Sequence, residues 1–425
     1  MQRPHFAPYT DAPGRELSHS VWMLEAQRHL RPAGVGSEPE IENWPHTAWS
    51  KSDTQTWSEM VAAQLSGADA LLLNVHPTFG ARAERYPAVG EMLRRSRPAL
   101  DRIARRRPAE AQALGVGLPY RQDTAARIRT GGAARDGGTP VDPALGAPTV
   151  GHALDELAVD PQPAADFLLR YGIPVTPRPA PVQALFGPAA WAFDDEEVRR
   201  MLAGGLLLDG VAAAVLDERG FARWTGVRVT ETVGREQDAA PGPYALERVT
   251  AEAPVAGVPE DTGLSVNLQP ALARLEPLDG ATVWTRVVTA EGVHWGAGRC
   301  GFANDLGGRA MVLAATRPQD LARDDNGRRL AHATVRFLEA DRPRLPLASG
   351  GPYLIPHLTL HQDDVHRLAV ANSSADPATV RVDFPSPPDE VHATMLAPLA
   401  EPAPAGCRLN GEPSVPHRGW LVVEW

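Results

Sequence analysis

Three glutamates at alternate positions, Glu38, Glu40 and Glu42, are the residues of this sequence best suited to acid–base chemistry. In a β-strand they would lie on one face, because successive side chains point to opposite sides of a sheet. Three neighbouring carboxylates repel one another and gain nothing from an apolar core. At the mouth of a cleft, their shared field can keep one of them protonated and another ionised. The alternative is a solvated edge strand with no chemical role.

Two tryptophans, Trp44 and Trp49, follow the acidic stretch directly. An indole ring offers an apolar face and an N–H donor, so such rings suit flat ligands with polar edges, such as sugars. Tyr9, Asn74 and His76 come from two other stretches and complete the predicted binding set. For His76, a structural role with satisfied hydrogen bonds is at least as well favoured as contact with a substrate.

Alternating strands and helices are predicted around these residues. The acidic strand is expected over residues 35–42, and a helix follows with Asp53 as its N-cap. The nearly continuous apolar run at 68–76 indicates a strand buried on both faces. Such βα units favour a parallel sheet, in which functional groups gather at the carboxyl ends of the strands. The acids and the polar residues that end the apolar run would therefore converge.

Composition limits the classes of function. The length of 425 residues indicates several domains, and the net charge of −10 argues against a nucleic-acid partner. Two distant cysteines, Cys300 and Cys407, form neither a disulfide framework nor a zinc cluster. No metal or cofactor is therefore expected, and the sequence fits a reducing cytoplasm. No apolar stretch approaches the length of a membrane span, so no membrane partner is expected either.

The strings EIENWP and GADALLLNV, with SKS and a helix between them, resemble the end of a known catalytic barrel. It is the (β/α)8 barrel of glycoside hydrolases related to family 42 β-galactosidases. In this resemblance the acidic strand is the seventh and carries the nucleophile, GADALLLNV is the eighth, and RPHFAPYTDAPG follows the sixth. The resemblance implies hydrolysis of a carbohydrate substrate by a retaining mechanism. It implies Glu40, then Glu42, then Glu38 as the nucleophile.

The chain departs from this family in one respect. A complete barrel needs eight units and on the order of 200–250 residues, whereas only about three units precede the next domain. A retaining glycosidase also needs a second carboxyl group as acid/base, and no residue here matches it. We therefore expect a truncated or split glycosidase that is inactive in isolation. The alternative is a non-catalytic oligomerisation or sugar-binding remnant of such an enzyme.

A second resemblance lies in the middle of the chain. LLLDGVAAAVLDERG, residues 206–220, resembles the β-galactosidase trimerisation domain, which has a Rossmann-like, class I glutamine-amidotransferase-like fold. True amidotransferases place a cysteine at the strand-to-helix elbow, where this chain has Asp209. We therefore expect this domain to serve in packing and in homo-oligomer formation, with a trimer as one possible oligomer, and not in amidotransferase chemistry. Asp194 and Glu197 indicate a capping box at the start of the preceding helix.

The expected fold class is α/β with three domains. Residues 1–110 are predicted to form the C-terminal part of a glycosidase barrel, and residues 111–340 the amidotransferase-like domain. Short alternating segments towards the C-terminus predict a small antiparallel β-sandwich over residues 341–425.

Overall fold

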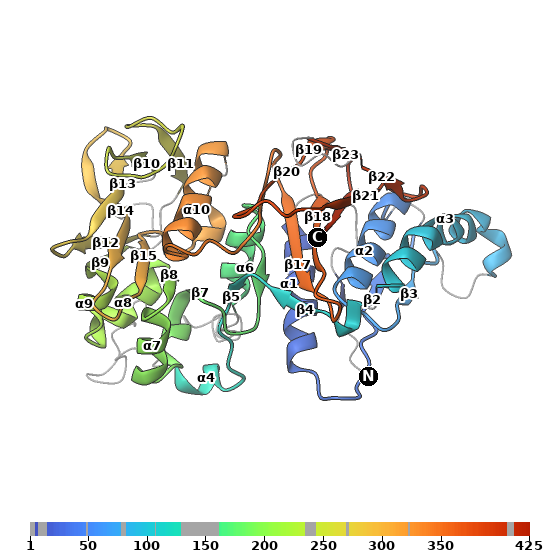
Figure 1. Ribbon diagram of the computed structural model, residues 1–425, viewed down its shortest axis with the longest axis horizontal. Helices are drawn as coiled ribbons and strands as arrows, with labels where there is room; N and C mark the ends of the chain where they lie inside the picture. Colours follow the sequence, from blue (N-terminus) through green and yellow to red (C-terminus); the bar gives the residue numbers. More distant parts are fainter. Residues whose placement is uncertain are drawn as a thin grey trace. The chain divides into compact units, whose positions relative to one another are not determined.

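The computed structural model describes most of the chain and divides it into two compact units. The described residues are 5–6, 15–47, 50–77, 82–106, 108–128, 161–233, 244–268, 272–321, 324–405 and 412–425. The first unit combines residues 1–115, 168–178 and 344–425, and the second combines residues 116–167 and 179–343. Figure 1 labels helices and strands of both units where there is room. The predicted domain limits at 110/111 and 340/341 stay predictions.

The first unit opens with a three-stranded parallel sheet in the order β1-β2-β3. Its strands are β1 His5–Phe6, β2 Glu40–Glu42 and β3 Leu72–Asn74. Three helices belong to the same part of the chain, α1 Arg15–Leu30, α2 Asp53–Leu65 and α3 Pro87–Ala104, with the short turns η1 Ala83–Arg85 and η2 Pro108–Glu110. Within the described ranges, this sheet does not close into a barrel.

The local sequence determines where helix α2, which follows the acidic stretch, begins and ends. The Ser52 side chain caps the helix by accepting from the Gln55 amide at 3.2 Å, so the N-cap lies one residue before the predicted Asp53. Gly67 follows the helix with a φ of 83°, a left-handed conformation that favours glycine. Trp57 is fully buried on the inner face of the helix. The helix therefore holds the loop that precedes it against a packed core.

The rest of the first unit is antiparallel. A six-stranded sheet runs in the order β22-β21-β24-β18-β17-β4. Its strands are β4 Gln112–Leu114, β17 Leu354–Leu360, β18 His366–Asn372, β21 His392–Leu396, β22 Ala403–Pro404 and β24 Trp420–Glu424. Strand β24 pairs on both sides and is buried along its whole length. The unit also contains β6 Val175–Thr176 and two small ladders, β16 Leu347–Ser349 with β20 Arg381–Asp383 and β19 Ala378–Thr379 with β23 Ser414–Val415.

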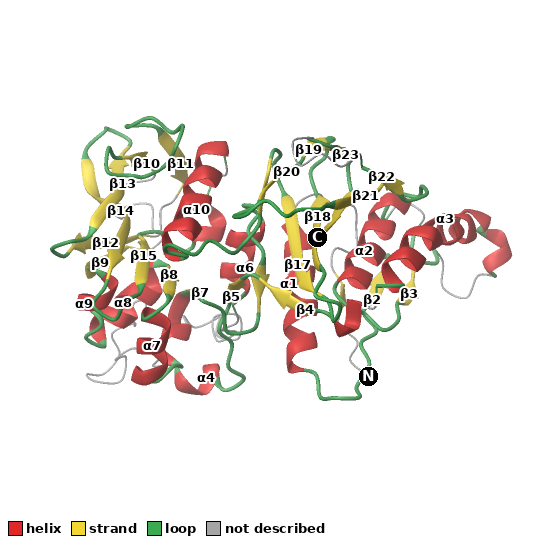
Figure 2. Cartoon of the chain, in the orientation of Figure 1, coloured by secondary structure: helices red, strands yellow, loops and turns green. Residues whose placement is uncertain are grey.

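The second unit is organised on one mixed sheet, in which its strands follow the order β11-β10-β13-β14-β15-β8-β7-β5, with β9 and β12 alongside. The strands are β5 Val116–Gly117, β7 Val182–Leu185, β8 Gly205–Leu208, β9 Val227–Val233, β10 Tyr244–Val249, β11 Gly263–Leu268, β12 Leu272–Pro277, β13 Thr282–Thr289, β14 His294–Ala303 and β15 Arg309–Leu313. The helical segments are α4 Thr124–Arg127, α6 Gln162–Leu169, η4 Gly187–Trp191, α7 Asp195–Leu202, α8 Gly210–Glu218, α9 Ala222–Thr225, η5 Pro318–Asp320 and α10 Asp325–Leu338. Helices and strands alternate in the parallel part of this sheet, from β7 to β8, and on to β9, and Figure 2 distinguishes the two kinds of element by colour.

The capping box predicted in the second unit is confirmed. The Asp194 side chain accepts from the Glu197 amide, and the Glu197 side chain accepts from the Asp194 amide, both at 2.8 Å. These reciprocal bonds satisfy two amides that a helix start leaves without intrahelical partners.

Two predicted strands are shorter than expected. The acidic strand covers Glu40–Glu42 instead of 35–42, so Glu38 lies before it. The apolar run forms a strand only at Leu72–Asn74, and Leu72 is 39% exposed, so burial on both faces was a wrong prediction. Strand β3 is the edge of its sheet, which explains why its apolar side chains are left partly open. Within the described ranges, no helix has the length and the apolar character needed to cross a bilayer.

Candidate functional site

The predicted acids do not form a row of three. Glu40 and Glu42 alternate with the fully buried Ile41 on β2 and therefore share one face of the sheet. Glu40 is 6% exposed, whereas Glu42 and Glu38 are half-buried. The strand thus brings two of the three glutamates to one face, at different depths.

Glu42 is the centre of a small polar cluster. Its Oε1 accepts from Asn74 Nδ2 at 3.1 Å, and Asn74 lies opposite it on β3. His46 Nε2 lies 3.1 Å from the same oxygen. We call Glu42, Asn74 and His46 the β2–β3 cluster. Parallel pairing of two strand ends brings Glu42 and Asn74 together, as the sequence analysis expected, whereas the contribution of His46 was missed.

His46 follows a turn that fixes its direction. Its amide donates to the Asn43 carbonyl at 2.7 Å, and its φ of 62° is left-handed. Its ring meets the Trp44 ring edge-on, with centroids 5.4 Å apart. Trp44 is 53% exposed, so one face of this indole is available to solvent beside the β2–β3 cluster. An imidazole at i+4 from a glutamate is the signal in the sequence that could have found this contact.

The other predicted binding residues do not all join this cluster. His76 is half-buried and packs edge-on against Tyr86, with ring centroids 4.9 Å apart. Trp49 and Tyr9 lie outside the described residues, so their predicted binding roles stay predictions. Within the described ranges, no three His, Cys, Asp or Glu side chains are grouped to hold a metal ion.

A fully buried ion pair lies behind the loop that follows the cluster. Lys51 Nζ is 2.7 Å from Glu59 Oε2 on α2, and both side chains are 0% exposed. Gln55 donates to the other oxygen of Glu59 at 2.9 Å. Burial raises the pKa of Glu59 to about 7, against the lowering effect of Lys51 and Gln55. This pair ties the loop to α2 and leaves no route for its carboxyl group to reach solvent.

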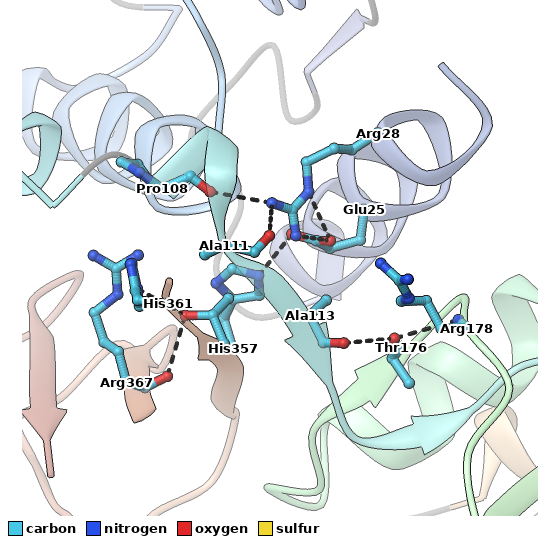
Figure 3. Close-up of polar contacts among 11 residues, drawn as sticks. Glu25, Arg28, Pro108, Ala111, Ala113, Thr176, Arg178, His357, His361 and Arg367 are labelled. Atoms are coloured by element: carbon cyan, nitrogen blue, oxygen red, sulfur yellow. Dashed lines mark hydrogen bonds and ion pairs between the residues drawn. The ribbon is translucent and has the colours of Figure 1, made fainter. Parts of the chain in front are cut away.

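A second buried carboxylate joins α1 to the antiparallel sheet, as Figure 3 shows. Glu25 Oε2 accepts from Arg28 Nη2 at 2.7 Å, and Glu25 Oε1 lies 2.7 Å from His357 Nε2 on β17. Arg28 also donates to the carbonyls of Pro108 at 3.1 Å and Ala111 at 2.7 Å. Burial alone would raise the pKa of Glu25, but Arg28 and His357 outweigh it and lower the pKa to about 2.

In the second unit, Asp209 occupies the elbow between β8 and α8. Its carboxylate accepts from the Gly187 amide at 2.9 Å and from the Ala212 amide at 2.8 Å. Burial raises the pKa of Asp209 to about 7, although these backbone donors lower it. The residue is therefore a buried helix cap, which agrees with the absence of an amidotransferase nucleophile at this position.

Comparison with known proteins adds two findings, and no family model matches the sequence. Over 149 residues the chain is 34% identical to the ATP phosphoribosyltransferase regulatory subunit of Burkholderia mallei (strain SAVP1). It is 41% identical to the subunit of the same name from Burkholderia thailandensis over 149 residues. These matches cover 32% of this chain, and the chain spans only 38% of the length of these curated relatives.

The fold has a different neighbour. The solved structure of alpha-L-fucosidase isoenzyme 2 from Paenibacillus thiaminolyticus superposes with a TM-score of 0.59 and 14% sequence identity. The likeness covers 98% of this chain and 64% of the fucosidase chain. At this identity it shows the fold alone, so the chain has a glycosidase-like fold of mixed α/β character.

The sequence relatives correct the function predicted from the acidic strand. Proteins that are 34% to 41% identical carry the name of a regulatory subunit and not that of a glycoside hydrolase. The prediction of a β-galactosidase-like hydrolase of carbohydrate metabolism was therefore wrong, and a carbohydrate substrate has no support. The alternative, an oligomerisation or sugar-binding remnant of a glycosidase, gains nothing from these matches either. The error came from a resemblance that reflects the fold, which many unrelated functions can share.

Proposed function

We propose that this chain is a regulatory subunit that acts by associating with a partner enzyme and not by its own catalysis. The observation that carries the proposal is its 34% to 41% identity to ATP phosphoribosyltransferase regulatory subunits over 149 residues. An ATP phosphoribosyltransferase is accordingly the first partner to test. A cytoplasmic location, predicted from the cysteine usage, is part of this proposal.

The geometry of the predicted site supports an associating role. Asn74 and His46 both contact the same oxygen of Glu42, so this carboxylate is held by its neighbours within the β2–β3 cluster. The ion pair of Lys51 and Glu59 is closed to solvent. The most open large side chain beside these groups is Trp44, and exposed aromatic residues are common anchors in protein interfaces.

We infer further that the glycosidase-like fold has the domain layout predicted from the sequence. In this layout the β1-β2-β3 sheet derives from a family 42-like barrel, and the mixed sheet of the second unit from the amidotransferase-like trimerisation domain. The antiparallel sheet of the first unit would be the C-terminal β-domain. Homo-oligomer formation, with a trimer expected, is part of this inference. Sedimentation of the purified chain measures it, and a monomer at all concentrations would contradict it.

The partner test uses co-expression. The chain and the ATP phosphoribosyltransferase of its source organism are produced together, and the complex is measured by light scattering after gel filtration. We expect one complex and a change in transferase rate when the chain is added to the isolated enzyme. Trp44→Ala is expected to weaken this association, and Val293→Ala, which also truncates an exposed apolar side chain, serves as the control. Separate elution with an unchanged rate would reject the proposed function.

A further inference from the structure

A cavity of about 240 Å³ in the first unit is lined by an unusual concentration of positive charge. Such a volume far exceeds the roughly 10–15 Å³ that a single water molecule needs. Its charged lining residues are Arg102, Arg105, Arg106, Arg367 and Glu424. Four arginines and one glutamate give the lining a formal charge of +3. Like charges this close repel one another unless an anion lies between them.

Arg367 on β18 is the strongest sign that an anion belongs here. Its residue is only 2% exposed, and among the described residues its Nε and Nη2 atoms have no hydrogen-bond partner. Burial lowers the pKa of Arg367 to about 10. The charges of Arg106 and Arg28 also lower this pKa, whereas the charge of Glu424 raises it. Figure 3 shows the Arg367 carbonyl, which accepts a hydrogen bond from the Thr359 hydroxyl on β17 at 3.4 Å, and the Arg367 guanidinium beside His361. A buried guanidinium with free donors is costly unless it is paired.

Glu424 does not supply the missing partner. It stands opposite Arg367 in the register of β18 and β24, but its two carboxylate oxygens each lie 3.2 Å from a nitrogen of Arg106. Arg106 thus neutralises Glu424 in a two-point contact. Arg102 Nη2 donates to the Thr394 hydroxyl at 2.7 Å, and Arg105 Nε donates to the Asp101 carbonyl at 3.2 Å. Among the described residues, no carboxylate pairs with the buried Arg367 or with Arg102 and Arg105, which are exposed at the mouth of the cavity.

The neighbouring pocket carries charges of both signs. A second pocket of about 190 Å³ shares Arg105 and Arg106 with the cavity and is also lined by Glu110, Asp363 and His361. Burial, followed by the charge of Arg367, lowers the pKa of His361 to about 4. The loss of hydration and the nearby guanidinium both disfavour the protonated imidazole, so His361 does not add a positive charge beside Arg367 near neutral pH.

We propose that this arginine cavity binds a phosphate group, held by the guanidinium groups of Arg102, Arg105 and Arg367. A phosphate dianion matches the unbalanced charge better than a carboxylate, which carries only one negative charge. Its oxygens can accept several guanidinium donors at once, in the planar geometry that arginine offers. The site belongs to the first unit alone and does not depend on the proposed association with a partner enzyme.

The test is calorimetric titration of the full chain with inorganic phosphate near neutral pH and at constant ionic strength. We expect saturable binding, which weakens by roughly tenfold or more in Arg102→Gln and Arg105→Gln, because each loses a charged donor. Arg94→Gln is the matched control: it removes the same charge from the same helix, its side chain is 72% exposed and it does not line the cavity. Its phosphate affinity should equal that of the unmodified chain.

Further ligands and one further variant complete the design. Titration with glycerol phosphate distinguishes a site for phosphate monoesters from a site for free phosphate. Binding of both ligands indicates a monoester site, and binding of inorganic phosphate alone indicates a site for free phosphate. Acetate should bind far more weakly. Arg367→Met should abolish the rise in melting temperature that phosphate causes in the unmodified chain. If phosphate shows no saturable binding, or if Arg94→Gln weakens it as much as the lining variants do, the proposal is wrong.

Discussion

Glu25 and Glu59 are two carboxylates of the first unit with nearly equal burial and opposite acid–base behaviour. Their residues are 2% and 0% exposed, and each has a cationic nitrogen 2.7 Å away. Yet the pKa is lowered to about 2 for Glu25 and raised to about 7 for Glu59. Burial and one close cation therefore do not decide the protonation state of a buried acid.

The difference lies in the remaining partners. Glu25 receives two donors from Arg28 and one contact from His357, and Arg28 is itself fixed by two backbone carbonyls. Glu59 has the single ammonium group of Lys51, the neutral amide of Gln55 and only a weaker effect from the charge of Arg418. A guanidinium with several anchored donors offsets the loss of hydration, whereas a single ammonium and an amide do not. Breaking these contacts one at a time tests this explanation.

The largest effect is expected from Lys51→Met. It leaves Glu59 buried without its cation, and breaking a buried pair in this way costs about 3–5 kcal/mol of unfolding free energy. Because the pKa of Glu59 already lies above that of an unfolded glutamate, its ionised form destabilises the fold. The loss should be larger at about pH 8 than at about pH 5, where Glu59 takes up a proton. Urea unfolding at both pH values measures it.

Arg97→Gln is the control for this experiment. Arg97 pairs with Asp101 on the surface of α3, with side chains 79% and 56% exposed. Its removal should change the unfolding free energy by under about 1 kcal/mol at either pH. An equal loss for Lys51→Met at both pH values would contradict the raised pKa of Glu59.

A smaller effect is expected from Glu25→Gln. The substitution keeps the shape but removes the charge that Arg28 and His357 face, at a cost of about 1.5–3 kcal/mol near pH 7. The lowered pKa of Glu25 stabilises the fold above the pKa of an unfolded glutamate, and this contribution is lost as the pH falls towards about 2. The difference in unfolding free energy between Glu25→Gln and the unmodified chain should therefore become smaller as the pH falls from about 6 to about 3. If this free-energy difference instead grows as the pH falls, the ionised Glu25 does not stabilise the fold.

Gln55→Leu should cost less, about 1 kcal/mol, because it removes one neutral donor from Glu59 and leaves Lys51 in place. It should also raise the pKa of Glu59 further. Carbon-13 NMR titration of labelled glutamate side chains measures this shift, with Glu59→Gln identifying the signal. A lower pKa in Gln55→Leu would show that the amide does not stabilise the charged form.

The same titration compares the two acids directly in the unmodified chain. The signal of Glu59 should have its midpoint near pH 7, and that of Glu25 should remain ionised down to about pH 2. No change in stability is needed for this readout. Two midpoints within the ordinary range of glutamate would remove the distinction between the two sites.

Features carried by a few neighbouring residues were predictable from the sequence. The capping box of Asp194 and Glu197 was confirmed, because both bonds lie within one helical turn. Parallel pairing of the strand ends brought Glu42 to Asn74. The extent of each strand was less predictable, since the apolar run at 68–76 contains only three strand residues and they lie at a sheet edge.

The buried networks were out of reach of sequence reasoning. Glu25 and Arg28 have the spacing of an ordinary surface pair on a helix, and nothing local indicates that His357, 332 residues away, completes their environment. The arginine cavity likewise joins α3 to strands more than 250 residues later in the chain. The function was misjudged for another reason: motifs shared by a fold do not specify what the fold does.

The first unit is assembled from three separate stretches of the chain, and this has a consequence for its synthesis. All residues of the second unit are synthesised before residues 344–425. The early helices, with Glu25 and Glu59, therefore emerge long before β17 supplies His357 and β24 completes the sheet. The second unit can fold during translation, as domains generally do. The first unit can complete its core only after the C-terminal stretch is made, so until then Glu25 lacks the contact with His357.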